Sequence, residues 1–338
     1  MSLSLEYRKY YLSNTPKKQH YVPQFILRNF SCGKKNKIFV FDKKSNRSFP
    51  SNSKDIGHEN NFYDDQVTEY GNETEFKLSE LETIVAPIVD KIVSQGSIKE
   101  LEEWEHKWLC LFSTVQMLRT NDTRDFLEES NKIINERVKE WEGSSSEGVD
   151  NFINMSKEEI KSSSINLLNS LPGSLVKNFL DKELSLLEAP ENQSFYISDH
   201  PVVKHNYLPR EGRGNLGIGL KGIQIYFPIS SKYCLSFLCS ELVQEIRQKV
   251  KNHQAARTLG VALPIDISEA EKMVNQLDNK TTNKVLDVNM DFNNSLQVIQ
   301  STRFIYSSCS KFLLAKDMLR TNPEISNQPK VVDGSKIF

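Results

Sequence analysis

The sequence predicts an α+β protein, with a helical middle bundle packed against a mixed or antiparallel sheet from the N-terminal and C-terminal parts. In the middle, apolar residues recur at the helical period across residues 73–141. Toward both ends, short runs rich in β-branched and aromatic residues predict strands. These strands do not alternate strictly with helices, which favours α+β over a doubly wound parallel sheet.

Length, charge and cysteine content bound the class of protein. The chain has 338 residues, and its 43 basic and 44 acidic side chains nearly cancel, so nucleic-acid binding would need a local patch. No apolar run approaches the roughly 18 residues of a membrane span. The first residues lack the features of a signal peptide, and the five cysteines form no C-x-x-C pair. We therefore expect a cytoplasmic protein with no membrane partner.

The N-terminal part combines one short helix with strands. His20 lies three residues before Pro23, and proline suits the first helical position because its missing N–H has no partner there. His20 is therefore expected just outside a helix N-terminus, where backbone N–H groups favour anions. Residues 37–42 predict a strand, residues 45–48 a turn into a second strand, and residues 60–63 a further short strand.

The middle of the chain predicts three successive helices. The first covers residues 73–94, and Pro87 inside it is expected to cause a kink. A capping box at residues 97–100 predicts the start of the second helix, which runs through Leu118. The third is more polar and covers about residues 123–141.

A candidate linker follows at residues 143–150, which begin with a Gly- and Ser-rich run. It is either a boundary or a long hairpin tip within one domain. A second capping box at residues 156–159 opens another helix, which ends at residues 172–173. We interpret residues 1–330 as a single domain with a helical subdomain at about 73–180.

After about residue 183 the pattern changes to strands. Residues 184–189 and 194–198 each predict a strand, and residues 223–229 and 233–238 predict a pair joined by a short turn. The remaining predicted elements are three helices and a short strand, at residues 241–252, 269–276, 292–300 and 304–306.

Three groups of polar residues could carry chemistry. One lies at the N-terminal helix start, one at the end of the second long helix, and one at a strand end, where a scaffold fixes the backbone. A spacing of three places the glutamine and arginine of the second group on one helix face. The candidate catalytic residues are His20, Asp199 and His200, and the candidate substrate-binding residues are Gln24, Gln116, Arg119 and Arg124.

Each of these residues has more than one chemical interpretation. Asp199 with His20 or His200 could bind a divalent metal, or Asp199 could orient a histidine general base. Arg119 could hold a phosphate or carboxylate with two hydrogen bonds. Structural roles compete: an Arg119–Asp199 ion pair, a turn capped by Asp199, or a histidine bound to a backbone carbonyl. His205, on a predicted loop, could join such a site.

These residues resemble a bacterial family known as domain of unknown function 4238. The resemblance covers about residues 18–310 and implies that the three groups belong to one architecture, but it brings no established activity. The family often has proline after Arg-Thr, where this chain has Asn121, and this departure affects the local turn prediction. The resemblance rests on residues 20–25, Leu27 and Phe30, on Gln116, Arg119, Thr120 and Arg124, on residues 198–202, and on residues 297–306.

Two functions follow as hypotheses. In the first, the chain is a metal-assisted hydrolase acting on a phosphodiester or nucleotide, with a divalent metal as cofactor; His20, Asp199 and His200 supply ligands or the general base, and an arginine holds the anion. In the second, it is a non-catalytic binding module whose same groups form a buried polar network. The helices across residues 73–141 would then face a protein partner.

Overall fold

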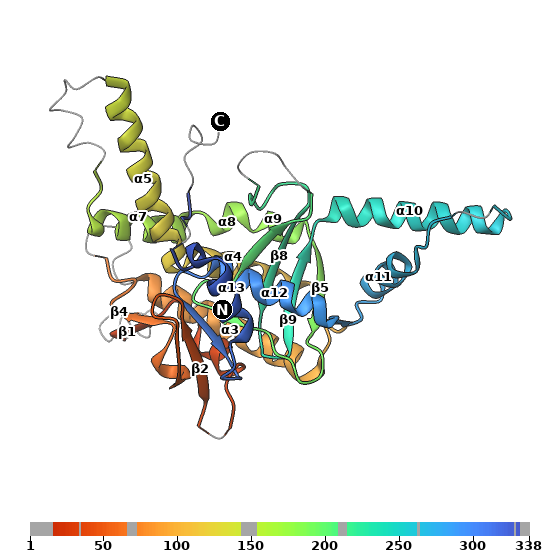
Figure 1. The fold of residues 1–338 in the computed structure, drawn as a ribbon, viewed down its shortest axis with the longest axis horizontal. Helices are drawn as coiled ribbons and strands as arrows, with labels where there is room; N and C mark the ends of the chain where they lie inside the picture. The colour runs from red at the N-terminus through yellow and green to blue at the C-terminus, as the bar shows by residue number, and fades with distance from the viewer. Residues whose placement is uncertain are drawn as a thin grey trace.

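A computed structural model describes residues 16–33, 35–65, 73–142, 154–208, 215–261, 264–327 and 329–331. The described chain combines helices with three β-sheets, and its strand pairs are antiparallel except for one parallel pair (Figure 1). The predicted α+β class is therefore confirmed. The linker predicted at residues 143–150 lies outside the described residues.

The N-terminal elements follow the prediction except near residue 60. The strands at residues 37–42 and after the turn are confirmed. The strand predicted at residues 60–63 is wrong in position, because β4 ends at Asn60 and Asn61 turns the chain with a positive φ of 55°. The elements are β1 (Lys18–His20), α2 (Gln24–Arg28), β2 (Lys37–Asp42), β3 (Arg47–Asn52), a 3-10 turn (Ser53–Asp55) and β4 (His58–Asn60).

The long helices are confirmed, but the start of the second one is corrected. The capping box is formed by Glu102 and Glu105, whereas Ser97 only closes a turn by accepting from the N–H of Lys99. Pro87 lies inside the first helix, as expected. The elements are α3 (Glu73–Gln95), α4 (Glu103–Leu118), α5 (Asn121–Glu142), α7 (Lys157–Ser170), α8 (Pro172–Leu175) and α9 (Lys177–Leu180).

The C-terminal part contains the predicted strands and several shorter elements. His205 lies in a strand and not in the predicted loop, because β7 pairs with β8. The strands are β5 (Glu183–Glu188), β6 (Ile197–Ser198), β7 (Val203–Asn206), β8 (Ile223–Pro228), β9 (Tyr233–Leu238), β10 (Asn283–Lys284) and β11 (Phe304–Ser307). The helices are α10 (Ser240–Thr258), α11 (Ser268–Asp278), α12 (Asp287–Gln300), α13 (Leu313–Thr321) and a 3-10 turn (Pro323–Asn327).

Three sheets organise the described chain. The five-stranded sheet has the order β10-β5-β9-β8-β7, and the four-stranded sheet has the order β3-β2-β11-β6. In the latter, β2 pairs antiparallel with β11, with Asp42 opposite Phe304, so the N-terminal and C-terminal parts share one sheet as predicted. The third sheet is the short pair β1-β4.

The five-stranded sheet packs one face against the helical middle of the chain. Ile225, Phe227, Leu235 and Phe237 alternate along β8 and β9, and each is fully buried. Phe227 lies 5.8 Å from the ring of Phe112 on α4. The opposite face of this sheet carries the intervening residues and meets α11 and α12. In Figure 1, α10 extends away from the body and α11 runs back toward the sheet.

A second, smaller core joins the four-stranded sheet to the C-terminal helices. Phe41 of β2 stacks on Phe312 at 5.5 Å, and Val298 of α12 and Ala315 of α13 complete the contact with no exposed surface. Within the described ranges, no helix combines the length and apolar character that crossing a membrane requires.

Candidate functional site

The first polar network surrounds Arg119, which follows the last residue of α4 and is 2% exposed. Its guanidinium donates to Glu82 at 2.7 Å, to the hydroxyl of Tyr63 at 3.2 Å and to the carbonyl oxygen of His20 at 2.5 Å. Burial opposes the charge, yet Tyr63 and Glu82 together hold the pKa of Arg119 above its usual range. The guanidinium therefore anchors β1 to α3 and α4.

Gln116 and Arg124 also bind main chain of the N-terminal part. Gln116 Nε2 donates to the carbonyl of Tyr21 at 2.8 Å. Arg124 donates to the carbonyl of Phe62 at 2.6 Å and lies over the ring of the same residue at 3.6 Å. Gln24 begins α2 and is half-buried. With the exception of Gln24, the predicted substrate-binding side chains thus hold the protein's own backbone.

The hydrogen bond from Arg119 uses only the backbone carbonyl of His20 and not its imidazole. The ring packs edge-on against His58 at 5.1 Å, and its buried Nε2 has no hydrogen-bond partner in the described part of the chain. Burial, with the neighbouring positive charges of His58 and Arg119, lowers the pKa of His20 to about 4. The ring is therefore neutral near pH 7.

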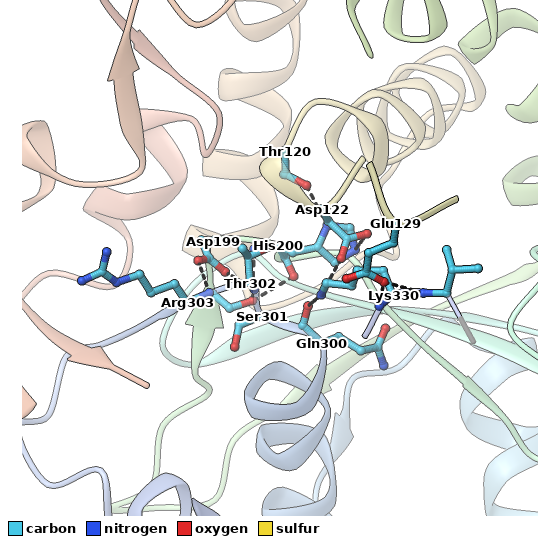
Figure 2. Close-up of polar contacts among 12 residues, drawn as sticks. Thr120, Asp122, Glu129, Asp199, His200, Gln300, Ser301, Thr302, Arg303 and Lys330 are labelled. Atoms are coloured by element: carbon cyan, nitrogen blue, oxygen red, sulfur yellow. Dashed lines mark hydrogen bonds and ion pairs between the residues drawn. The ribbon is translucent and has the colours of Figure 1, made fainter. Parts of the chain in front are cut away.

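Asp199 holds the turn between α12 and β11. Its buried carboxylate accepts from the N–H of Thr302 at 2.9 Å, of Arg303 at 2.7 Å and of Phe304 at 2.7 Å, as Figure 2 shows in part. Burial raises the pKa of Asp199, and the three backbone donors and Lys43 oppose that effect. The carboxylate thereby joins the end of β6 to the start of β11.

His200, the next residue, lies in a second network that we call the His200 cluster: Thr120, Asp122, His200 and Lys330 (Figure 2). Its Nδ1 lies 2.8 Å from the hydroxyl of Thr120, and its Nε2 lies 3.7 Å from the carboxylate of Asp122. Asp122 also meets the ammonium of Lys330 at 2.7 Å. Burial lowers the pKa of His200 to about 4, although Asp122 acts in the opposite direction.

The C-terminal segment closes the His200 cluster. Lys330 Nζ donates to the carbonyl of Gln300 at 3.0 Å, at the last residue of α12. The N–H groups of Lys330 and Val331 both donate to Glu129 on α5, at 2.5 and 2.9 Å. Burial raises the pKa of nearby Asp125 to about 6. Groups from α5, α12 and the C-terminal segment thus converge around one imidazole.

The predicted site residues therefore fall into two networks that adjoin where α4 ends. Within the described part of the chain, no hydrogen bond or ion pair links His20 with Asp199. Asp122 and Lys330 were missed by the sequence analysis. Asp122 carries a signal, because it lies three residues after Arg119 within the polar stretch at the end of α4. For Lys330 the sequence contains no such signal, since this residue is far along the chain from the other members of the cluster.

The His200 cluster has a limited chemical repertoire. A neutral imidazole between a hydroxyl and a carboxylate is the arrangement that activates nucleophiles in hydrolases. Here the imidazole–carboxylate distance exceeds a hydrogen bond, and Thr120 is 2% exposed. Across the described ranges, no three His, Cys, Asp or Glu side chains group in a way that could hold a metal ion.

A scan against known protein families matches residues 18–311 to the family described as "Protein of unknown function (DUF4238)". The chain belongs to this family. The searches of curated proteins and of solved structures found no match. The matched region includes both networks except Lys330. The contacts that Lys330 makes with the His200 cluster therefore lie outside the region that defines the DUF4238 family.

A cleft of about 710 Å³ lies on the other face of the five-stranded sheet, between α11 and α12. Its floor comes from alternate residues of four strands. Ser236 of β9 lies at the centre, opposite Ser185 of β5 on one side and Tyr226 of β8 on the other. Next to this row, His205 of β7 lies opposite Gln224 of β8.

Two buried oxygens in this cleft lack partners. Ser236 is 1% exposed, and its Oγ has no hydrogen-bond partner within the described residues. The same holds for Oδ1 of Asn293, an 8% exposed residue of α12, whose amide donates to the carbonyl of Asn289. The sequence contained a weak signal for this face, because Gln224 and Tyr226 on β8 and Ser236 on β9 interrupt otherwise apolar strands at every second position.

Proposed function

We propose that this DUF4238 protein is a non-catalytic binding module whose ligand occupies the sheet cleft. The observation that carries the proposal is the pair of unpartnered buried oxygens, Ser236 Oγ and Asn293 Oδ1, inside that cleft. An unsatisfied buried polar group costs about 1–3 kcal/mol, so a ligand that supplies the missing hydrogen bonds gains from both groups. The cleft volume lies within the range of small-molecule sites.

The two polar networks support a scaffold role beside this binding site. The guanidinium of Arg119 and the carboxylate of Asp199 each make three hydrogen bonds, four of the six to main-chain groups. Saturated buried networks of this kind fix one packing arrangement and leave few donors for a ligand. In this proposal they hold the N-terminal segment and the turn before β11, and so support both sheets.

The proposal includes a cytoplasmic location. All five cysteines are free thiols, and Cys110, Cys234 and Cys239 are buried. Unpaired thiols are typical of a reducing compartment.

The test is a titration followed by fluorine NMR of the protein. The chain labelled with 3-fluorotyrosine is titrated with nucleoside monophosphates, monosaccharides and amino acids, and the resonance of Tyr226 is assigned with Tyr226→Phe. We expect at least one class to shift the Tyr226 resonance in the natural chain and not in Ser236→Val, whose methyl groups fill the floor. A cleft that responds to no class would overturn the proposal.

A second candidate is the metal-assisted hydrolase acting on a phosphodiester or nucleotide, favoured by the Thr120–His200–Asp122 order. Asp122 and His200 would supply two of the ligands of a divalent metal that enters with the substrate phosphate, and such a metal would polarise the phosphoryl oxygen. In this alternative His200 carries the predicted catalytic role, because the Asp199 carboxylate binds three backbone N–H groups and His20 lies in the other network. Hydrolysis of bis(4-nitrophenyl) phosphate with Mg²⁺ or Mn²⁺ that disappears in a folded His200→Asn variant would establish it.

A further inference from the structure

We infer that the sheet cleft takes a nucleotide, with the base against the sheet and the phosphate at the rim. This inference rests on the proposed binding function and names its ligand. Three features of the cleft lead to it: a neutral floor of mixed donors and acceptors, apolar and aromatic walls, and two lysines at the mouth.

The floor of the cleft suits the edge of a nucleobase. Ser236, Ser185, Gln224 and Tyr226 supply hydroxyl and amide groups, none of which is charged. Tyr226 already donates to Gln224, which leaves the Gln224 amide N–H groups for a ligand. Burial lowers the pKa of His205, so its imidazole stays neutral near pH 7 and both donates and accepts. Neutral amides and hydroxyls recognise base edges by paired hydrogen bonds.

The walls suit a flat aromatic group. From α12, the Phe292 ring stands edge-on to His205 at 4.9 Å and to Tyr226 at 6.3 Å, and it is 37% exposed. From α11, Met273 and Leu277 line the opposite side. α11 contains no buried residue, so its apolar side chains remain available to a ligand. Every nucleobase has a flat face that can stack on an aromatic ring such as that of Phe292.

The rim suits an anion attached to that flat group. Lys272 on α11 and Lys284 on β10 line the cleft and are exposed, and Glu269 is the single acidic residue among the lining residues described. The charge of the rim is therefore positive by one unit. Lys272 lies 3.9 Å from the carboxylate of Glu269, so Lys284 is the rim cation without an ion-pair partner among the described residues. A nucleotide phosphate would supply that partner, whereas a monosaccharide carries no anionic group.

The test compares nucleotides with their parts by isothermal titration calorimetry on the full chain. Adenosine, guanosine, cytidine and uridine monophosphates are titrated beside their nucleosides, ribose 5-phosphate and inorganic phosphate. We expect at least one monophosphate to bind about tenfold more tightly than its nucleoside, with no measurable binding of the two phosphates that lack a base. The preferred base follows from the same series.

Variants separate the floor from the rim. Lys272→Gln combined with Lys284→Gln is expected to reduce monophosphate affinity to that of the nucleoside while nucleoside affinity stays unchanged. Lys251→Gln on the exposed surface of α10 is the matched control and should change neither. Ser236→Ala is expected to weaken both ligands about tenfold, and thermal unfolding verifies that each variant is folded.

The outcomes distinguish this inference from the proposed function. If amino acids or sugars shift the Tyr226 resonance and no nucleotide binds, the nucleotide assignment is wrong and the binding function stands. If no class of ligand binds, both fail. If a nucleotide binds with the same affinity to the lysine double variant and to Ser236→Ala, its site lies elsewhere and the inference is overturned.

Discussion

At the scale of single residues, the buried polar side chains of this protein bind main chain more than they bind one another. Asp199 accepts three backbone N–H groups, and Arg119 donates to the carbonyl of His20. A charged side chain makes stronger hydrogen bonds than a neutral one, which offsets part of its desolvation cost. Removing such a side chain therefore leaves several backbone groups unpaired at once.

Asp199→Asn is expected to destabilise the fold by about 3 kcal/mol or more. The amide nitrogen is a donor that replaces one acceptor oxygen. Either the N–H of Thr302 or the N–H groups of Arg303 and Phe304 therefore lose their acceptor, and the remaining bonds lose their charge. Urea unfolding measures the change, with Asp291→Asn on the exposed side of α12 as control. A variant as stable as the natural chain would show that the carboxylate is not structural.

The pH dependence of stability is expected to include a contribution from His200. Its pKa is about 4 in the folded chain and about 6.5 unfolded, so the unfolded state binds more protons between these values. The contribution is fully present above pH 6.5 and is lost as the pH falls toward 4, by about 3 kcal/mol in total. His200→Asn should flatten the unfolding free energy over this window relative to the natural chain. Parallel curves for the two proteins would contradict the assignment.

At the scale of elements, the N-terminal segment is held by a close backbone approach at Gly57. The carbonyl of Gly57 accepts from the N–H of Tyr21 at 2.9 Å and of Val22 at 3.1 Å. Gly57 has a φ of +65°, and a Cβ there would lie 3.2 Å from Val22 Cβ and 3.1 Å from Leu27 Cδ1. The entry of the chain into α2 therefore depends on a residue without a side chain.

Gly57→Ala is expected to cost about 1–3 kcal/mol, from the left-handed backbone and from the crowding against Val22. Gly33→Ala is the matched control, because Gly33 has a φ of +69° but no atom within 4 Å of an added Cβ. It should lose only the backbone part, about 1 kcal/mol. Chemical unfolding of the two variants measures the difference, and equal losses would exclude the crowding.

At the scale of the whole molecule, residues 330–331 near the C-terminus connect α5 with the end of α12, two helices that are distant in sequence. Lys330 joins Asp122 and Glu129 of α5 to Gln300 at the end of α12. The ion pair between Lys330 and Asp122 lies beside the imidazole of His200 (Figure 2). Stability of the helical middle is thereby coupled to the last described residues of the chain.

Lys330→Met is expected to destabilise the protein by about 2 kcal/mol, because it leaves the partly buried carboxylate of Asp122 without the ammonium 2.7 Å away. Asp122→Asn should offset part of this loss, so a double-mutant cycle should give a coupling of about 1 kcal/mol or more. Lys316→Met on the exposed surface serves as the control. Additive effects of Lys330→Met and Asp122→Asn would contradict a direct interaction.

Much of the fold could be predicted from periodicity. The helix predicted at residues 73–94 is α3, and the strand pair at 223–229 and 233–238 is β8 with β9. β7 and β10 were not predicted, because their sequences, Val-Lys-His-Asn and Asn-Lys, are mostly polar and lack the run of β-branched and aromatic residues that predicts a strand. Such strands exist only through pairing with β8 and β5.

The candidate site was less predictable for a related reason. Sequence pattern identified Asp199, His200 and Arg119 as polar residues at element ends, but it could not show that Arg119 binds the His20 carbonyl while the His20 ring faces His58. Main-chain acceptors carry no residue-specific signal. The cleft was also missed, because its floor combines single residues from four strands.

By itself, the sequence determined the α+β class, the long helices and the family to which the chain belongs, because periodicity, helix caps and motif order are local properties. Only the tertiary structure decided the partners of each polar group and the position of the cleft. Those depend on strand order and on contacts between residues such as Asp122 and Lys330, which lie 208 positions apart in the chain. Burial makes these contacts decisive for pKa values and for the free energy of unfolding, because a buried polar group without a protein partner cannot form a hydrogen bond with water instead.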